Sequence, residues 1–212
     1  MSILTKTDEA YWIAKEDEIR ALLVDLADLG VVIDRAACRR GWTDDPHCLA
    51  RPGVAEALAR ARAALPEGHN FLVADGWRSW PVQQAAAADV ENEIREAHRD
   101  WPPEQVAEQA WTMAPMARVV PRFGSHRYGG AVDLTVIGPD GRELNMGVPI
   151  DHCTGPEAAL LWYDLLDRRT PEEDVFRANR WILIRAMAAG GFEPYLPEFW
   201  HWNYRNDLYA KP

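Results

Sequence analysis

The stretch GSHRYGGAVDLTVI, residues 124–137, decides the fold. A polar, glycine-rich loop leads into an apolar run from Ala131 to Ile137, which is typical of a buried β-strand. Asp133 lies inside that run, and an ionised carboxylate is costly to bury unless hydrogen bonds or a cation compensate it. Either backbone N–H groups hold Asp133 beside a surface histidine, or Asp133 and His126 together bind a divalent metal.

Outward from this strand, hydrophobic periodicity and the placement of Gly and Pro predict further helices and strands. Helices are expected at Thr7–Leu29, Pro52–Leu65, Pro81–His98, Pro103–Met113, Gly155–Leu166 and Pro171–Ala189. Strands are expected at Val31–Ile33, Phe71–Ala74, Phe192–Tyr195 and Phe199–Tyr204, and a surface loop at residues 35–51. A turn at Pro139-Asp140-Gly141 should return Glu143 beside the central strand. The predicted fold is α+β: one domain, residues 1–212, with a small, mainly antiparallel sheet flanked by helices and a metal site at the sheet.

The composition argues against several classes of protein. Acidic residues outnumber basic ones, 33 to 23, and no basic cluster is visible, so no nucleic-acid partner is expected. No run approaches the ~18 apolar residues that span a bilayer, and the charged N-terminus is unlike a secretory signal. We therefore expect no membrane partner and a cytoplasmic location. Three cysteines do not indicate a disulfide framework, although a Cys38–Cys48 bridge stays open in an oxidising compartment.

A second motif, Pro197-Glu198-Phe199-Trp200-His201, offers a third metal donor and a carboxylate close to it in the chain. A catalytic zinc uses three protein ligands and keeps one position open for water. His126, Asp133 and His201 would be these ligands, and Glu198 would take the proton from the water. Residues three apart in an ideal strand face opposite ways, so Glu198 and His201 converge only through a bend. Alone, a Glu-x-x-His pair in an aromatic strand is more often an ordinary pair of core or surface residues than part of a metal site.

A third motif, Asp75-Gly76-Trp77-Arg78-Ser79, follows a predicted strand directly, where active-site loops are often found. The guanidinium group of Arg78 could stabilise the oxyanion that forms when a carbonyl is attacked. An ordinary salt bridge at a helix start explains the same residue. Two other groupings are weaker. Cys38, His47 and Cys48 match no ordinary zinc-module spacing, and Cys153 fits a buried thiol better than a nucleophile.

Together the three motifs resemble the D-Ala-D-Ala dipeptidases of the vancomycin-resistance type, within the zinc D-alanyl-D-alanine peptidase family. That family's pattern is Ser-x-His-x-x-Gly-x-Ala-x-Asp, followed far downstream by Glu-x-Trp-His. The matching residues here are His126, Gly129, Ala131, Asp133, Glu198, Trp200 and His201. Arg78 falls where these enzymes keep their transition-state arginine. The resemblance implies a hydrolase that holds one zinc ion per chain.

The same resemblance implies which residues bind the substrate. Asp151, shortly after Met146-Gly147, corresponds to the carboxylate that holds the substrate's free amino group. Gly124 replaces the first serine of the pattern, so Ser125 is the candidate for a substrate-side hydroxyl. The segment that follows Asp151, residues 152–155, also departs from the family's sequence. Both departures concern substrate recognition rather than the metal.

Three functions remain open for this chain. The first is a zinc-dependent dipeptidase that hydrolyses D-Ala-D-Ala or a related small dipeptide by metal-activated water. The second is a related zinc amidase acting on a peptidoglycan stem peptide or a secondary-metabolite peptide. The third is a zinc-binding protein without turnover, although a purely structural zinc would need neither Glu198 nor Arg78. In the first two the partner is a small peptide substrate, and the oligomeric state is left open.

Overall fold

The computed structural model describes residues 14–113, 126–152 and 155–204, and its centre is a five-stranded sheet. In spatial order the strands are β2 (Val32–Ile33), β4 (Asn70–Asp75), β5 (Ala131–Ile137), β7 (His201–Asn203) and β6 (Glu193–Pro194). β2 runs parallel to β4, and every other neighbouring pair is antiparallel. A separate two-stranded pair joins β1 (Val24–Asp25) to β3 (Leu49–Ala50). The α+β fold with a small, mainly antiparallel sheet is confirmed.

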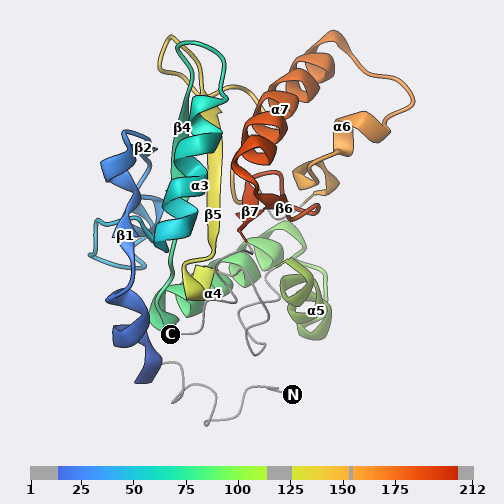
Figure 1. Cartoon of the computed structure of the whole chain (residues 1–212). Coiled ribbons are helices and arrows are strands. Elements are labelled where there is room, and N and C mark those ends of the chain that lie inside the picture. The colour runs from blue at the N-terminus through green and yellow to red at the C-terminus, as the bar shows by residue number, and fades with distance from the viewer. Residues whose placement is uncertain (1–13, 114–125, 153–154, 205–212) are drawn as a thin grey trace.

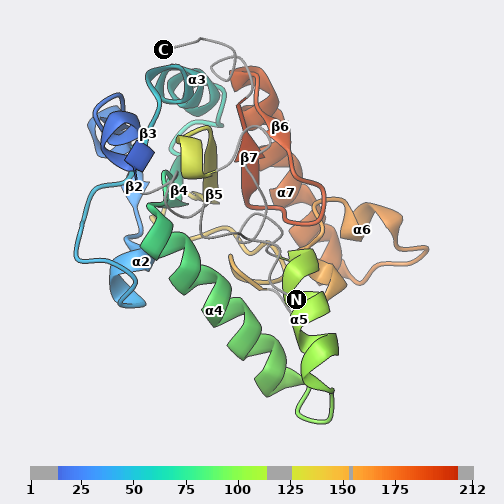
Figure 2. The ribbon, with the colours of Figure 1, turned by 90° about the horizontal axis from the view of Figure 1, so that it is seen from below.

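Two long helices, α3 (Pro52–Ala63) and α7 (Pro171–Gly190), pack side by side on one face of the sheet (Figures 1 and 2). Pro52 suits the first turn of α3 because the N–H it lacks would have no partner there. α7 begins with a capping box and ends at Gly191, whose φ of 86° favours glycine. Between these helices and the sheet lies the core, which includes Leu58, Val132, Leu134, Val136, Leu183 and Met187, all fully buried.

Two more helices lie on the other side of the sheet from α3 and α7, as Figure 2 shows. These are α4 (Trp80–Ala97) and α5 (Pro103–Met113). They pack against each other around a small cluster of their own that includes Ile94, Val106 and Ala110. Since side chains alternate across a strand, the residues of β5 that do not enter the main core point towards this second side.

The N-terminal segment differs from the predicted helix at Thr7–Leu29, of which residues 7–13 lie outside the described part. Residues 14–20 are helical, but the chain then enters β1 and the 3-10 helix η1 (Leu26–Leu29). β1 pairs with β3, and Asp25 caps η1 by accepting from the N–H of Ala27 at 3.0 Å. These contacts with a distant strand and a local cap compete with the helix. The predicted loop at residues 35–51 likewise contains α2 (Ala36–Arg39) and β3.

The predicted helix at Gly155–Leu166 is also wrong, since the chain forms only η4 (Pro156–Ala158) and α6 (Trp162–Leu165). The buried Arg180 of α7 donates to the carbonyls of Glu157 at 2.6 Å and Ala159 at 2.5 Å. These are carbonyls that a continuous helix would use internally. A buried guanidinium from another helix has therefore replaced the local hydrogen bonds.

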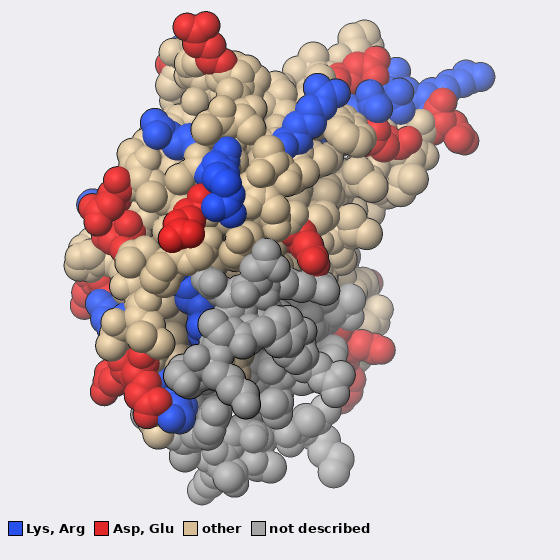
Figure 3. Space-filling model, viewed as in Figure 1, with Lys and Arg blue, Asp and Glu red and all other residues tan. Residues whose placement is uncertain are grey.

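The charge distribution on the surface is relevant to the partners expected from the sequence. On the face shown in Figure 3, Lys and Arg side chains are interspersed with Asp and Glu rather than gathered into a patch. In the part of the chain that the structure describes, no helix is both long and apolar enough to cross a membrane. Cys38 and Cys48 are free thiols, and burial raises the pKa of Cys48 well above its usual range.

Candidate metal centre and active site

The register of three adjacent strands places three polar residues in one row. Asp75 at the end of β4 lies opposite Asp133 of β5, which lies opposite His201 at the start of β7. Residues directly opposite each other on neighbouring strands point to the same face. The β4–β5 pairing shifts register between Val73 and Asp75, and this irregularity brings Asp75 rather than Ala74 opposite Asp133.

A fourth residue joins this row from the 3-10 turn η3 (His126–Tyr128), which immediately precedes β5. His126 Nε2 lies 3.1 Å from Asp133 Oδ2 and 3.2 Å from His201 Nδ1. His201 Nδ1 lies 3.1 Å from Asp133 Oδ1. His126, Asp133 and His201 are the group that could hold a metal among the described residues. The structure brings together all three of the metal ligands expected from the sequence.

Both histidines are oriented by a second hydrogen bond. His126 Nδ1 lies 2.6 Å from the carbonyl oxygen of Gly76, and His201 Nε2 lies 3.2 Å from Asn203 Oδ1. Because these oxygens only accept, the two nitrogens carry hydrogen, and in neutral rings the lone pairs are then on His126 Nε2 and His201 Nδ1. Those lone pairs face each other and the Asp133 carboxylate. The lone pairs of these three groups repel one another unless a proton or a metal cation lies between them.

The donor set and its spacing fit a zinc ion. Two ligands that are each about 2.0–2.1 Å from a tetrahedral zinc are separated by roughly 3.3 Å. The three separations observed here are 3.1, 3.1 and 3.2 Å. Two imidazoles and one carboxylate leave a fourth position for water, as in catalytic zinc sites. The hydrogen bonds that the two histidines donate to Gly76 and Asn203 are of the kind that orients metal-bound histidines.

The electrostatics of Asp133 show how strongly the centre favours a charged carboxylate. Burial alone would raise the pKa of Asp133, yet His126, His201 and Arg78 hold that pKa well below its usual range. For His201 the signs are reversed. Burial alone would lower the pKa of His201, but its contacts with Asp133 and Glu198 raise that pKa overall. The cluster thus keeps a negative charge in a buried place, which a bound cation would stabilise further.

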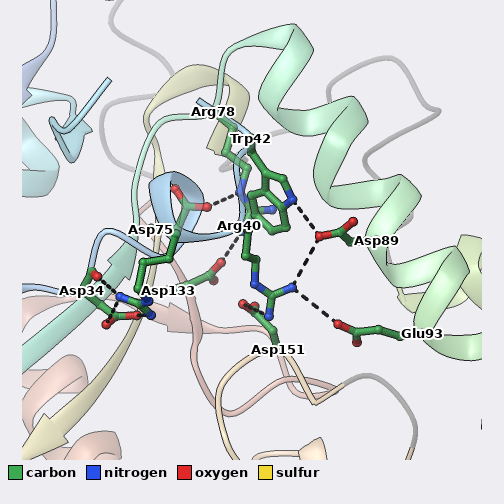
Figure 4. Close-up of polar contacts among 10 residues, drawn as sticks. Asp34, Arg40, Trp42, Asp75, Arg78, Asp89, Glu93, Asp133 and Asp151 are labelled. Atoms are coloured by element: carbon green, nitrogen blue, oxygen red, sulfur yellow. Dashed lines mark hydrogen bonds and ion pairs between the residues drawn. The ribbon is translucent and has the colours of Figure 1, made fainter. Parts of the chain in front are cut away.

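Arg78 lies directly beside this centre. Its Nη2 is 2.6 Å from Asp133 Oδ2, and its Nε is 2.5 Å from Asp75 Oδ2 (Figure 4). Burial opposes the charge on Arg78, but Asp75, Asp133 and Asp151 together raise its pKa. The guanidinium is therefore charged and held from two sides. Arg78 lies close enough to the candidate metal site to contact a molecule bound to a metal there as well.

Glu198 belongs to the same electrostatic cluster. A tight turn from Tyr195 to His201, with the Glu198 N–H donating to the Tyr195 carbonyl at 3.0 Å, supplies the bend that the strand needed. Burial raises the pKa of Glu198 to about 7, against the opposing influence of His201 and Arg78. A carboxylate that titrates near neutrality can both take up and release a proton during turnover.

A more open group is the Asp151–Arg40 pair, in which the two side chains face each other (Figure 4). Arg40 Nη2 lies 3.4 Å from Asp151 Oδ2, while Arg40 Nη1 lies 3.5 Å from Glu93 and 3.9 Å from Asp89 of α4. Burial raises the pKa of Asp151 to about 6, and Asp133 adds to that effect. Asp151 also has a positive φ of 65°, which is uncommon for a non-glycine residue.

Not every site residue expected from the sequence can be placed, and others were missed. Ser125 lies outside the described residues. Asp75, Asn203 and Arg40 were not singled out for roles. A signal existed for Asn203, because it is two residues from His201 and so shares its face of the strand. Nothing in the irregular sequence around Arg40 indicated its contact with Asp151.

Comparison with known proteins agrees with this geometry. Residues 31–212 match the family model described as D-ala-D-ala dipeptidase, Peptidase M15. The chain is similar to a protein named D-alanyl-D-alanine dipeptidase from Synechocystis sp., with 27% identity over 183 residues. That match covers 78% of this chain and 72% of the relative. The chain is a peptidase that belongs to the M15 family of D-Ala-D-Ala dipeptidases.

Proposed function

We propose that this protein is a zinc-dependent dipeptidase that hydrolyses D-Ala-D-Ala or a closely related small dipeptide, with residues 1–212 forming one catalytic domain. The observation that carries the proposal is the convergence of His126 Nε2, His201 Nδ1 and the Asp133 carboxylate at 3.1–3.2 Å. Beside that donor set are Glu198, whose pKa is about 7, and the charged Arg78. A structural metal site has no use for either group.

The chemistry divides between the metal and the chain's own residues. A zinc ion held by the three donors would polarise the scissile carbonyl and acidify the attacking water. Glu198 takes the proton of that water and delivers it to the nitrogen of the leaving amino acid. Arg78 supplies a positive charge where negative charge develops on the carbonyl oxygen. Asp75 holds the Arg78 guanidinium in place through its 2.5 Å contact.

Two residues are assigned to substrate binding from the family resemblance. The Asp151 carboxylate would bind the free ammonium group of the dipeptide, and this charge pairing selects against peptides with a blocked amino end. Ser125 would contribute a hydroxyl on the substrate side of the metal. The second candidate is a zinc amidase that acts on a stem peptide or a secondary-metabolite peptide. The departures of this chain from the family's sequence at residues 124 and 152–155 favour this candidate.

The deciding experiment combines metal analysis with an assay for free amino acid released from D-Ala-D-Ala, with and without chelator. L-Ala-L-Ala, an N-acetylated dipeptide and a longer stem peptide complete the substrate panel. We expect one zinc per chain and cleavage of D-Ala-D-Ala that chelator abolishes and added zinc restores. Zinc binding with cleavage of only the longer peptide would favour the second candidate. Failure to bind zinc stoichiometrically, even after reconstitution, would contradict both.

A further inference from the structure

The loop after β4 and the turn η3 are hydrogen-bonded to each other in both directions. The Arg78 N–H donates to the His126 carbonyl at 3.1 Å, and His126 Nδ1 donates to the Gly76 carbonyl at 2.6 Å. The indole of Trp77 donates to the Arg127 carbonyl at 3.0 Å. The position of a metal-ligating histidine and that of the arginine beside it therefore depend on each other.

The Arg127 side chain adds a further connection between the loops. Its side chain is only 4% exposed, and its Nη1 donates to the Arg78 carbonyl at 3.1 Å and to a Glu16 carboxylate oxygen at 2.7 Å. The guanidinium lies over the Trp80 ring, 5.2 Å from the ring centroid. A buried cation of this kind is stable only while its carboxylate partner remains.

Glu16 comes from the N-terminal helix, residues 14–20, which is far from the site in sequence. The same carboxylate oxygen that accepts from Arg127 also accepts from the backbone N–H of Trp80, the first residue of α4. Ile19 of this helix packs against Trp80 in a small cluster that includes Trp77 and Tyr128. One carboxylate thus connects η3, the loop after β4 and the start of α4.

We propose that Glu16 is a positioning residue for the metal centre, which it serves through Arg127. By holding the Arg127 guanidinium, Glu16 keeps η3 against the loop after β4, and so keeps His126 and Arg78 in register with Asp133. Without that carboxylate, the guanidinium loses a 2.7 Å ion pair in a place largely closed to water, and breaking a buried ion pair by removing one partner is strongly destabilising. Movement of the guanidinium releases the Arg78 carbonyl and loosens the turn that carries His126.

The test compares Glu16→Gln with Glu18→Gln, a matched control two residues along the same helix. Glu18 is exposed and pairs with Lys15 at 2.6 Å on the same helix. The first measurement is the zinc dissociation constant by competition with a chromogenic chelator, for which we expect Glu16→Gln to be about 10- to 100-fold weaker. The second is turnover of the zinc-loaded enzyme, for which kcat should fall more than tenfold with KM within about threefold.

A double variant tests whether Glu16 acts through Arg127 and guards against a single variant that does not fold. Glu16→Gln with Arg127→Met removes both charges of this ion pair together. Both substitutions break the same contact between Glu16 and Arg127. The double variant should therefore bind zinc no more weakly than Arg127→Met alone. Additive losses would overturn the proposal. So would a Glu16→Gln protein that melts earlier but binds zinc like Glu18→Gln.

This inference rests on the zinc site of the proposed function but not on its peptidase activity, which enters only the turnover measurement. The zinc competition needs no substrate, so it remains decisive if wild-type protein binds zinc but cleaves no peptide. In that case the proposed dipeptidase activity fails while the role of Glu16 stands or falls on metal affinity alone. Equal zinc affinities for Glu16→Gln and Glu18→Gln would overturn the role of Glu16 whatever the peptidase assay shows.

Discussion

The candidate metal centre and the Asp151–Arg40 pair hold carboxylates by different means. In the candidate metal centre, Asp133 is carried by a central strand and its contacts are 2.6–3.1 Å long. In the Asp151–Arg40 pair, Asp151 is carried by a loop at positive φ, and its contact with Arg40 is 3.4 Å long. Strand register fixes the first group, whereas loop conformation fixes the second. Under the proposed function, the sheet would set the reaction type and the loops would set the choice of substrate.

The two carboxylates also differ in the sign of their pKa shifts. The histidines and Arg78 around Asp133 outweigh its burial and hold its pKa well below the usual range. Around Asp151 burial dominates, and the pKa rises to about 6. The negative charge of Asp133 is therefore already stabilised by its neighbours before any metal binds. The negative charge of Asp151 would still be stabilised by a further cation. That difference suits a permanent metal ligand on one side and a binding group for a passing ammonium on the other.

The largest expected effect comes from removing a donor of the metal centre. His201→Ala leaves two protein ligands, so the protein should lose stoichiometric zinc and its activity should fall to background. Metal analysis after dialysis, together with the amino-acid release assay, measures both. His69→Ala, at a half-buried histidine that precedes β4 at the end opposite Asp75, is the matched control and should retain one zinc. A His201→Ala protein with full zinc content would remove His201 from the ligand set.

The next largest effect separates chemistry from metal binding. Glu198→Gln keeps the size of the side chain but cannot take up a proton, so kcat should fall about 10²- to 10⁴-fold while zinc content stays at one. Glu193→Gln, on the exposed strand β6, provides the control with a near-normal rate. Retention of substantial activity by Glu198→Gln would mean that another group serves as the base.

The sequence predicted the central elements well where local signals agree with the final structure. β5 and α5 have the predicted bounds, because the apolar run from Ala131 to Ile137 and the helix beginning at Pro103 face no competing contacts. The Thr7–Leu29 and Gly155–Leu166 helices failed because distant partners, β3 and Arg180, took their backbone hydrogen bonds. Neither partner leaves a trace in the local sequence.

The candidate site was predictable to the same extent and for the same reason. The three metal donors carry a recognisable spacing, and the structure brings them within 3.2 Å of one another. Their alignment in one row depends on the register of β4, β5 and β7 and on the shift before Asp75, which are long-range properties. The pairing of Asp151 with Arg40 depends on two loops, so sequence reasoning could name only one of the partners.

A smaller effect is expected at the Asp151–Arg40 pair. Asp151→Asn removes the charge that would bind the substrate's ammonium group, so kcat/KM for D-Ala-D-Ala should fall roughly 10- to 150-fold, mostly through KM. Zinc content should not change, since Asp151 is not a metal ligand. A wild-type enzyme that cleaves the free and N-acetylated dipeptides equally well would show that Asp151 does not read the amino end.

The same substitution should have the opposite effect on stability. The native pKa of Asp151, about 6, lies above its ordinary value of 3.8, a difference that corresponds to ~3 kcal/mol. Between these two values the native state binds a proton that the unfolded state has lost, so wild-type stability decreases as pH rises from about 4 to 6. Metal-free Asp151→Asn protein should therefore be more stable than wild type at pH 8.

Urea unfolding of both proteins in chelator at pH 4 and pH 8 measures this effect. The advantage of Asp151→Asn should be largest at pH 8 and shrink towards pH 4, where Asp151 is protonated in the native state. Any gain from placing Asn at a positive φ does not depend on pH, so the pH-dependent part isolates the buried charge. An advantage that is equal at both pH values would mean that Arg40 already compensates Asp151 fully. The contrast between the two carboxylates would then rest on geometry alone.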